Sequence, residues 1–226
     1  MRRKDAFLIN FMKKTIIIIP SRLSSSRLPN KPLLKINNKS LINHVYEKGR
    51  STNIGDVYVA TGDGEIFKEV IKNNGKSILT KKDHLTGTDR IYEAYNQLNR
   101  NDIDYIINLQ GDEPLIDTND IINLNNLAIK HNFEIATLAC KLDSINFKNE
   151  NVVKVICNEN IEKNKFSSAQ KFFRSIESEK IENIYHHIGI YIYKVSSLKT
   201  FVGLKQSFNE INLKLEQLRA LDNNIK

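Results

Sequence analysis

A cluster of cationic and hydroxyl side chains lies between residues 21 and 32, where the sequence reads SRLSSSRLPNKP. Arg22, Arg27 and Lys31 place three positive charges among serines that include Ser25. Arginine binds phosphate oxygens through two parallel hydrogen bonds and lysine acts as a point charge, so this composition suits a polyphosphate. The segment lacks the Gly-x-x-x-x-Gly-Lys spacing of a Walker loop. Its charge alone is equally compatible with a solvated basic loop.

A pair of carboxylates stands in the segment Asn108–Pro114, which reads NLQGDEP. A hydrophobic strand would deliver both acids to its carboxyl end, beside a glycine that lets another group approach the backbone closely. Mg²⁺ prefers one or two carboxylates together with substrate phosphate oxygens and water, which makes Asp112 the natural metal ligand. The alternative is a plain turn in which aspartate and glycine are the turn formers.

The third candidate is Arg90, in the segment Thr86–Arg90 that reads TGTDR and would open a helix. A positive charge in the first turn is unfavourable with the helix dipole, so its presence is easier to explain if the guanidinium has a ligand. A surface salt bridge with Asp89 or Glu93 is the other explanation.

These three segments need a scaffold, and the hydrophobic pattern predicts alternating strands and helices up to about residue 131. The expected strands are Thr15–Ile19, Asp56–Ala60, Lys76–Leu79 and Asp104–Leu109. The expected helices begin at Ser40, Glu65, Thr86 and Asp117, with Ser40 as an N-cap and Thr86 with Asp89 resembling a capping box. This alternation favours an α/β fold with a mostly parallel sheet covered by helices on both faces. Ligands bind such sheets beyond the carboxyl ends of the strands, where all three segments would lie.

After Glu134 the pattern loosens. Strand-like runs follow at Ile135–Cys140, Val152–Cys157 and His187–Tyr193, and a last helix is expected over Ile211–Leu221 with Leu215 and Leu218 inward. Because no internal repeat and no linker rich in glycine, serine or proline interrupts the chain, we expect one domain with a lobe.

Composition excludes several classes of protein. The 226 residues are 40% hydrophobic, carry a net charge of +8 and include only two cysteines, Cys140 and Cys157, which exclude a disulfide scaffold and a zinc spacing. No apolar run approaches the ~20 residues of a membrane span. The apolar stretch behind residues 1–14 is too short for a signal peptide, so we expect a cytoplasmic protein. The lysines are scattered without an RNA-binding signature, which argues against polymeric nucleic acid as a partner.

The motifs together resemble the 3-deoxy-manno-octulosonate cytidylyltransferase (CMP-Kdo synthetase) family. They are Ser-Arg-x-x-Ser-x-Arg-Leu-Pro-x-Lys-Pro-Leu, Gly-Thr-Asp-Arg and Gln-Gly-Asp-Glu-Pro, supported in order and spacing by Val59-Ala60-Thr61, His187-x-Gly189-Ile190-Tyr191 and Leu215-Glu216-Gln217-Leu218-Arg219. The resemblance runs from about Lys14 to Arg219 and is most specific over the first 140 residues.

This resemblance implies a nucleotide-diphospho-sugar transferase (Rossmann-like) fold with a smaller dimerisation lobe, in a homodimer. It implies transfer of CMP from CTP to a 3-deoxy sugar acid with Mg²⁺, giving CMP-Kdo and pyrophosphate for lipopolysaccharide synthesis. Carried over by position, the nucleotide site would comprise Arg22, Ser25, Arg27, Lys31, Ala60, Thr61, Arg90 and Gln110. The sugar-acid site would comprise Gln110, His187, Tyr191, Glu216 and Gln217. The catalytic residues would be Arg22, Lys31 and Asp112, of which Asp112 would bind the Mg²⁺.

The sequence departs from the family at Gly62, where the family usually has aspartate, at Ser168, where it has a substrate-side arginine, and at Leu213, where it has an acid. The family also continues into a segment with a second Mg²⁺-binding aspartate, so an end at Lys226 predicts a truncated carboxyl terminus. The expected organisation is a basic extension over 1–13 and one domain over 14–226. Its nucleotide part would span about 14–131, and its sugar-binding and dimerisation part about 132–226.

Three functions therefore stay open at the level of sequence. The first is a cytidylyltransferase for 3-deoxy-D-manno-octulosonate, which Gly-Thr-Asp-Arg and Gln-Gly-Asp-Glu-Pro favour. The second is an acylneuraminate-type or other sugar-acid cytidylyltransferase. The third, of another class, is a weakly active or inactive nucleotide-binding paralogue.

Overall fold

Strand β1, residues Thr15–Ser21, lies in the middle of the main sheet and is buried along its whole length. Strands β4 (Val57–Thr61) and β6 (Tyr105–Asn108) flank it, and both run parallel to it. Strand β5 (Ser77–Leu79) extends the parallel set beyond β4. Runs of β-branched residues without polar alternation are typical of strands covered on both faces. These four strands confirm the parallel sheet predicted from the sequence.

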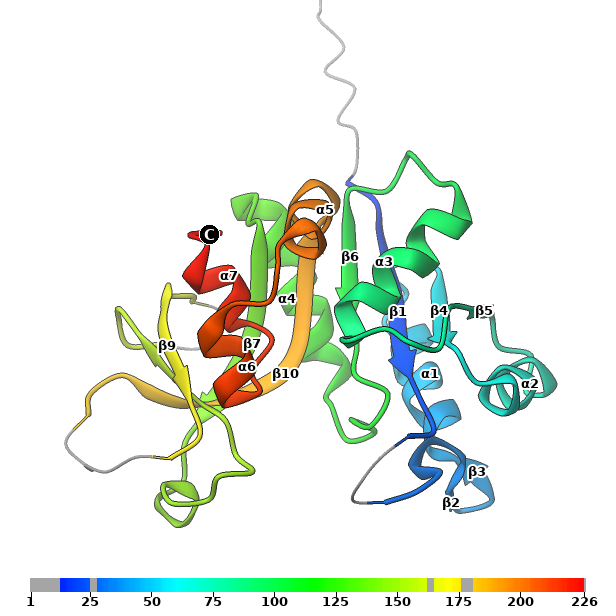
Figure 1. The fold of residues 1–226 in the computed structure, drawn as a ribbon, viewed down its shortest axis with the longest axis horizontal. Helices are drawn as coiled ribbons and strands as arrows, with labels where there is room; N and C mark the ends of the chain where they lie inside the picture. Colours follow the sequence, from blue (N-terminus) through cyan, green and yellow to red (C-terminus); the bar gives the residue numbers. More distant parts are fainter. Residues whose placement is uncertain (1–12, 25–27, 162–164, 176–180, 226) are drawn as a thin grey trace, which may run out of the picture.

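The computed structural model in Figure 1 describes residues 13–24, 28–161, 165–175 and 181–225. In its second half, β10 (Ile184–Lys194) runs antiparallel to β6 and pairs at its other end with β8 (Lys154–Cys157). Strand β7 (Ile135–Lys141) pairs with the opposite edge of β10, and β9 (Ala169–Phe173) pairs with β8. The order β5-β4-β1-β6-β10-β8-β9 confirms the α/β class, with an antiparallel extension that the sequence did not specify.

Helices cover both faces of this sheet (Figure 1). They are α1 (Leu41–Ser51), α2 (Gly64–Lys72), α3 (Gly87–Leu98), α4 (Thr118–His131), α5 (Val195–Gly203), α6 (Phe208–Leu213) and α7 (Leu218–Asp222), with short 3-10 turns η1 (Lys31–Leu33) and η2 (Ser144–Asn146). Side chains alternate between the faces of a strand. Accordingly Ile16 and Ile18 pack under α3 and α5, whereas Ile17 and Ile19 pack under α1, α2 and α4.

The predicted helix starts are right, although their caps differ. Thr86 accepts a hydrogen bond from the Asp89 backbone at 3.1 Å and donates one to the Asp89 carboxylate at 2.8 Å, which fixes the first turn of α3. Ser40 precedes α1 as expected, but its hydroxyl accepts from the Asn43 side chain instead of capping a backbone N–H.

The single helix predicted over Ile211–Leu221 is wrong. Lys214 adopts a left-handed conformation with φ 53°, which ends α6 and separates it from α7. The inward positions were nevertheless right, because Leu215 and Leu218 are both buried. Strand β9 and helix α5 were not anticipated. Helix α5 has no side-chain cap hydrogen bond and no acid in its first turn, so it lacks the usual signals of a helix start.

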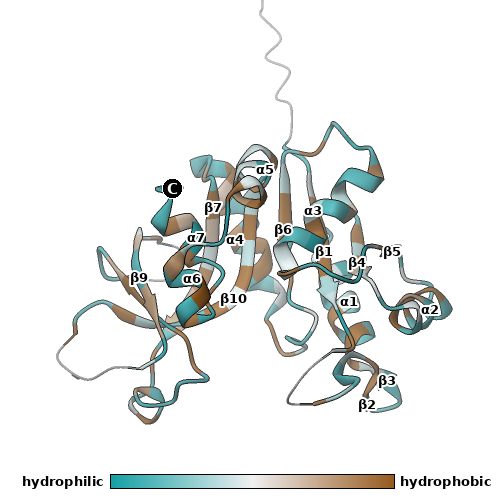
Figure 2. Cartoon of the chain, viewed as in Figure 1, coloured by the Kyte–Doolittle hydropathy of each residue, from teal (hydrophilic) through white to brown (hydrophobic). Residues whose placement is uncertain are grey.

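The hydrophobic core has three parts. Two lie on the faces of the sheet, and the third joins β8, β9 and α7 through Val155, Phe172 and Leu218 in the smaller lobe. Figure 2 shows hydrophobic residues along the central strands and hydrophilic ones on outer helix turns. Among the residues that the structure describes, no helix is long and apolar enough to cross a membrane.

Candidate active site

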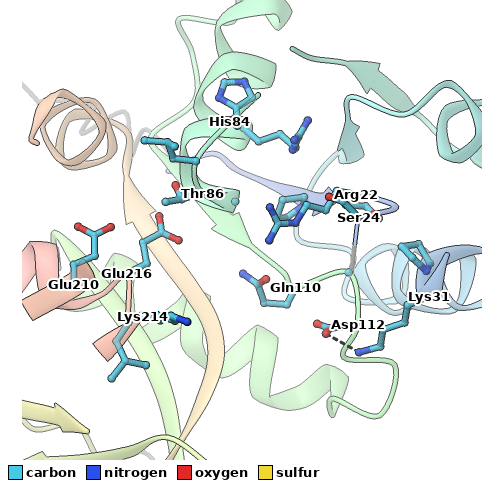
Figure 3. A pocket seen from close by; sticks show the side chains of 18 of the residues that line it. Arg22, Ser24, Lys31, His84, Thr86, Gln110, Asp112, Glu210, Lys214 and Glu216 are labelled. Carbon is cyan, nitrogen blue, oxygen red and sulfur yellow. Dashed lines mark hydrogen bonds and ion pairs between the residues drawn. The ribbon is translucent and has the colours of Figure 1, made fainter. Parts of the chain in front are cut away.

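A cavity of about 730 Å³ opens at the carboxyl ends of β1 and β6. Its lining includes parts of the loop after β1 and of the loop after β6, the start of α3, and several of residues 206–216 in the smaller lobe. In Figure 3, Arg22, Lys31 and Asp112 lie on one side, Glu210, Lys214 and Glu216 on the other, and Gln110 between them. The structure thus brings together the three segments singled out in the sequence.

The first wall is the loop after β1. Arg22, Ser24 and Lys31 line the cavity, whereas Ser25 and Arg27 lie outside the described residues. The Leu23 backbone donates to the Asp63 carboxylate at 2.8 Å, which ties this loop to the start of α2. The cavity therefore presents Arg22 and Lys31 from an anchored backbone.

Lys31 and Asp112 form an ion pair, with Nζ 2.7 Å from Oδ2. Asp112 follows Gly111, where a Cβ atom would come within 2.9 Å of the Pro20 carbonyl oxygen. Only glycine lets the loop after β6 pass this close to the end of β1. This close approach holds Asp112 beside the cationic loop.

Arg90 occupies the start of α3 but is almost fully buried. Its guanidinium donates to the Thr80 hydroxyl at 2.6 Å and to the carbonyls of Lys81 and Lys82 at 2.9 and 3.2 Å. Burial lowers the pKa of Arg90, and nearby Asp63 opposes this shift. The surface salt bridge considered from the sequence is thus absent, and Arg90 instead fastens the 80–82 loop to the edge of the cavity.

Ala60 and Thr61 end β4 and are buried, and neither belongs to the cavity lining. The Thr61 hydroxyl accepts from the Asp63 backbone at 3.1 Å and shapes the turn into α2. At Gly62 a Cβ atom would lie 2.8 Å from the Lys82 Cα atom and 3.1 Å from the Arg90 guanidinium. The departure from the family pattern at this position therefore accommodates the loop that Arg90 holds.

Gln110 lies between the two walls. Its side-chain amide donates to Asn108 Oδ1 at 3.1 Å, and Asn108 in turn donates to the Thr88 hydroxyl at 3.4 Å. This chain of contacts orients Gln110 from β6 and α3, so its amide oxygen remains available to the cavity.

Glu216 lines the far wall, and its Oε1 atom is buried without a hydrogen-bond partner among the described residues. Burial raises the pKa of Glu216, and the hydroxyls of Thr88 and Thr86 only partly offset this. A buried acceptor without a partner is costly, and a hydroxyl-bearing ligand would satisfy it.

Glu210, also in this wall, is locked to Arg219. The Arg219 guanidinium donates to both Glu210 carboxylate oxygens at 2.9 and 2.6 Å, lies 3.7 Å from Asp89 and packs over the Phe201 ring. Burial acts to raise the pKa of Glu210, but the Arg219 guanidinium lowers it overall. Arg219 therefore joins α6, α7 and the first turn of α3.

Three residues predicted for the sugar acid, His187, Tyr191 and Gln217, are not part of the cavity lining. His187 is buried in β10, where its ring lies 3.0 Å from the Thr137 hydroxyl and packs against Tyr191. Burial lowers the pKa of His187 to about 4. His187 thus lies within the β7–β10 layer and stays neutral at pH 7.

Several lining residues were missed by the sequence reasoning: Ser24, His84, Gln206, Glu210 and Lys214. One signal could have located part of this wall. Ser207 and Glu210 form a reciprocal capping box, whose S-x-x-E spacing marks the start of α6.

The cavity's donor set fits a metal ion carried by a phosphate ligand. Within the described ranges, no group of three or more His, Cys, Asp or Glu side chains forms a metal centre. Of the three carboxylates in the lining, Asp112 is the one beside Lys31 and Arg22. One such carboxylate matches the few protein ligands that Mg²⁺ takes when phosphate oxygens and water complete its coordination.

The arrangement suits positioning rather than covalent catalysis. One wall carries cations and the Asp112 carboxylate, and the opposite wall carries Glu216, whose free oxygen can accept hydrogen bonds from hydroxyl groups. Phosphates and a polyol can therefore be held side by side. The Cys140 thiol lies 3.8 Å from His186, but burial raises its pKa and neither residue lines the cavity. This pair is therefore no activated nucleophile.

Comparison with known proteins agrees with this geometry. The cytidylyltransferase family model matches residues 16–226. The 3-deoxy-manno-octulosonate cytidylyltransferase of Thermodesulfovibrio yellowstonii is 43% identical over 225 residues, covering 94% of this chain and 88% of the relative. That of Brucella canis is 41% identical over 212 residues, covering 92% and 84%.

A solved CMP:2-keto-3-deoxy-manno-octonic acid synthetase complexed with CTP superposes with a TM-score of 0.84 at 36% identity, over 94% of this chain and 87% of its own. A cytidylyltransferase from Leptospira borgpetersenii, at 18% identity and a TM-score of 0.61 over 95% and 74%, shows a shared fold alone. With nearly the whole chain matched at this identity, the protein belongs to the cytidylyltransferase family, among the 3-deoxy-manno-octulosonate cytidylyltransferases.

Proposed function

We propose that this protein transfers CMP from CTP to 3-deoxy-D-manno-octulosonate (Kdo), releasing pyrophosphate, and that the CMP-Kdo supplies lipopolysaccharide synthesis. The observation that carries the proposal is the meeting of Arg22, Lys31 and Asp112 at one wall of a cavity whose other wall holds the unsatisfied acceptor of Glu216. A triphosphate and a polyol acid need these two walls.

The reaction forms one P–O bond and breaks another. The anomeric hydroxyl of the sugar acid attacks the α-phosphorus, the bond to the bridging oxygen breaks, pyrophosphate leaves, and the hydroxyl proton passes to solvent. Such a transfer depends mostly on positioning and charge stabilisation, and asks for no protein nucleophile.

On the nucleotide side, Arg22, Lys31 and the predicted Ser25 and Arg27 would hold the triphosphate. Arg90 would act near the base by holding the 80–82 loop, with the backbone at Ala60 and Thr61 nearby. Asp112 would bind Mg²⁺, which when present neutralises charge on the phosphates.

On the sugar side, Gln110 would lie at the junction of the two substrates and Glu216 would accept sugar hydroxyls. His187, Tyr191 and Gln217 would support this wall from behind. His187 is neutral at pH 7 and lies in β10, which pairs with β7 and passes beside Gln110 at Gly189.

We further propose a cytoplasmic homodimer. Among described residues, β7 pairs only with β10, so its other edge offers backbone groups and half-buried apolar side chains to a second copy. Sedimentation of the full chain tests this independently of activity.

The test of the function is pyrophosphate release from CTP and Kdo, with CMP-Kdo identified by mass spectrometry, in Mg²⁺ and after chelation. We expect turnover in the presence of Mg²⁺ and none after chelation, and we expect little turnover when N-acetylneuraminate replaces Kdo. Preference for the nine-carbon acid would favour the acylneuraminate type. CTP binding without any turnover would establish a catalytically inactive paralogue and overturn the proposal.

A further inference from the structure

We propose that Lys214 binds the carboxylate of the sugar acid and thereby selects an acidic sugar over a neutral one. This inference deepens the proposed function and rests on it. Lys214 lines the cavity from the turn between α6 and α7, on the wall that carries Glu216 (Figure 3). It is exposed, and no described side chain forms a hydrogen bond or ion pair with its amino group.

The backbone at Lys214 is left-handed, a conformation that lysine does not favour. Ten non-glycine residues in the described part of the chain have positive φ; nine are asparagines and the tenth is Lys214. Composition does not explain this, because the chain has 28 asparagines and 25 lysines. Asparagine tolerates the left-handed region, whereas lysine there costs about 1 kcal/mol or more. A strained lysine that faces a cavity points to a ligand.

The strained turn is held firmly from outside the cavity. Arg174 donates to the carbonyl oxygens of Leu213 and Lys214 at 3.0 and 3.1 Å. The Leu215 backbone donates to the Glu210 carbonyl at 3.2 Å. With the backbone fixed in this way, the Lys214 side chain projects from a preset position instead of a mobile loop.

The distribution of charge assigns the ligand. The other cations of the lining are Arg22, Lys31 and Arg90, all on the nucleotide side, and the guanidinium of Arg90 is already occupied by the 80–82 loop. On the wall formed by residues 206–216, Lys214 is the one cation of the lining. Arg219 lies behind this wall and is occupied by Glu210.

A sugar acid presents hydroxyls and a carboxylate, and this wall offers a partner for each. Glu216, with its unpartnered oxygen, can accept from hydroxyls but would repel a carboxylate. Lys214, two residues away, carries the opposite charge and can donate to a carboxylate. Lys214 would attract the carboxylate of the sugar and Glu216 would repel it, so the pair selects both an acidic sugar and its orientation.

The experiment compares the full-length wild type with Lys214→Met and Lys214→Asn. Calorimetry gives the Kd for Kdo, and pyrophosphate release gives KM for Kdo and for CTP. We expect the Kd and KM for Kdo to rise about tenfold in both variants, the low end for a hydrogen bond to a charged group, with KM for CTP unchanged. Lys205→Met, an exposed lysine of the same lobe outside the cavity, is the matched control and should behave as wild type.

Two further measurements separate binding from structure. The carboxamide of Kdo, which lacks the charge, should bind wild type and Lys214→Met equally. Lys214→Asn should unfold at the same temperature as wild type or higher, because asparagine suits the left-handed turn.

An unchanged Kd for Kdo in both variants would overturn the inference. So would an equal rise in KM for CTP, which would place Lys214 on the phosphates, or an equal loss of affinity for the carboxamide. The calorimetric comparison does not need turnover. An inactive wild type would therefore overturn the proposed function alone, and the Lys214 assignment would still stand or fall on Kdo binding.

Discussion

The Lys31 amino group lies 2.7 Å from the Asp112 carboxylate, and this ion pair joins the loop after β1 to the loop after β6 on one wall of the cavity. Both side chains are partly exposed, so the pair adds little to stability. Each is also assigned a substrate-side partner in the proposed function. The pair keeps the two groups in register, and under the proposed function we expect it to be exchanged for phosphate and Mg²⁺ when the nucleotide binds.

The first prediction concerns Asp112. Asp112→Ala should abolish pyrophosphate release, because it removes the carboxylate proposed to bind Mg²⁺, while the free energy of unfolding changes by less than about 1 kcal/mol as expected for an exposed pair. Cys157→Ala, at a buried cysteine outside the cavity, is the control and should turn over nearly as wild type. Equal losses in the two variants would undo the site assignment.

The second prediction concerns Gly111. An alanine here places Cβ 2.9 Å from the Pro20 carbonyl, so the loop carrying Gln110 and Asp112 must shift away from β1. A displacement of about 1 Å at a reacting group can cost up to about 10²-fold in rate, so we expect kcat to fall at least about tenfold. Gly64→Ala is the control, since nothing lies within 4 Å of its Cβ position at the start of α2. Unchanged kcat in Gly111→Ala would show that this close approach does not set the geometry.

The third prediction concerns the buried ion pair of Arg219 with Glu210. Arg219→Leu leaves Glu210 buried without its partner, which should cost about 3–5 kcal/mol in urea unfolding. The double variant Glu210→Leu with Arg219→Leu should be less destabilised than the single Arg219→Leu, because neither charge then remains unpaired. Additive losses would mean that the two side chains act independently.

The fourth prediction concerns pH. In the fold the pKa of His187 is lowered to about 4, from 6.5 for the free side chain. Between these values the unfolded chain binds a proton that the native state does not, so the free energy of unfolding falls as pH drops from 6.5 to 4. This shift is worth about 3 kcal/mol in total. His187→Gln should lose this part of the acid slope in urea unfolding at pH 7 and 4.5, whereas exposed His131→Gln should keep it.

The nucleotide half could be predicted from sequence because its signals are local. The run Thr15–Ile19 contains four consecutive isoleucines, which favours a strand covered on both faces, and proline and glycine punctuate the loops at its end. The positions of Arg22, Lys31 and Asp112 at one sheet edge follow directly from parallel pairing.

The far wall could not be predicted in the same way, because tertiary contacts decide it. Lys214 ends α6, although lysine is not a residue type that signals the end of a helix. The turn is held by Arg174, which is forty residues away in the sequence. Arg90 finds its partners in backbone carbonyls, which no side-chain motif reports. Residues 206–216 are tied to the cavity through Arg219 of α7, which pairs with Glu210 of α6 and lies 3.7 Å from Asp89 of α3.

The position of β10 between β6 and β8 also affects how the chain folds during synthesis. The edge of β6 that ends at Asn108 finds its partner only when Tyr191 has emerged, more than eighty residues later. At the usual 5–20 residues per second, the parallel half waits roughly 4–17 s with this edge unpaired. An open strand edge is a template for other chains, so folding in the cell exposes this protein to misassembly during that interval, and binding of a chaperone to β6 would be most useful then.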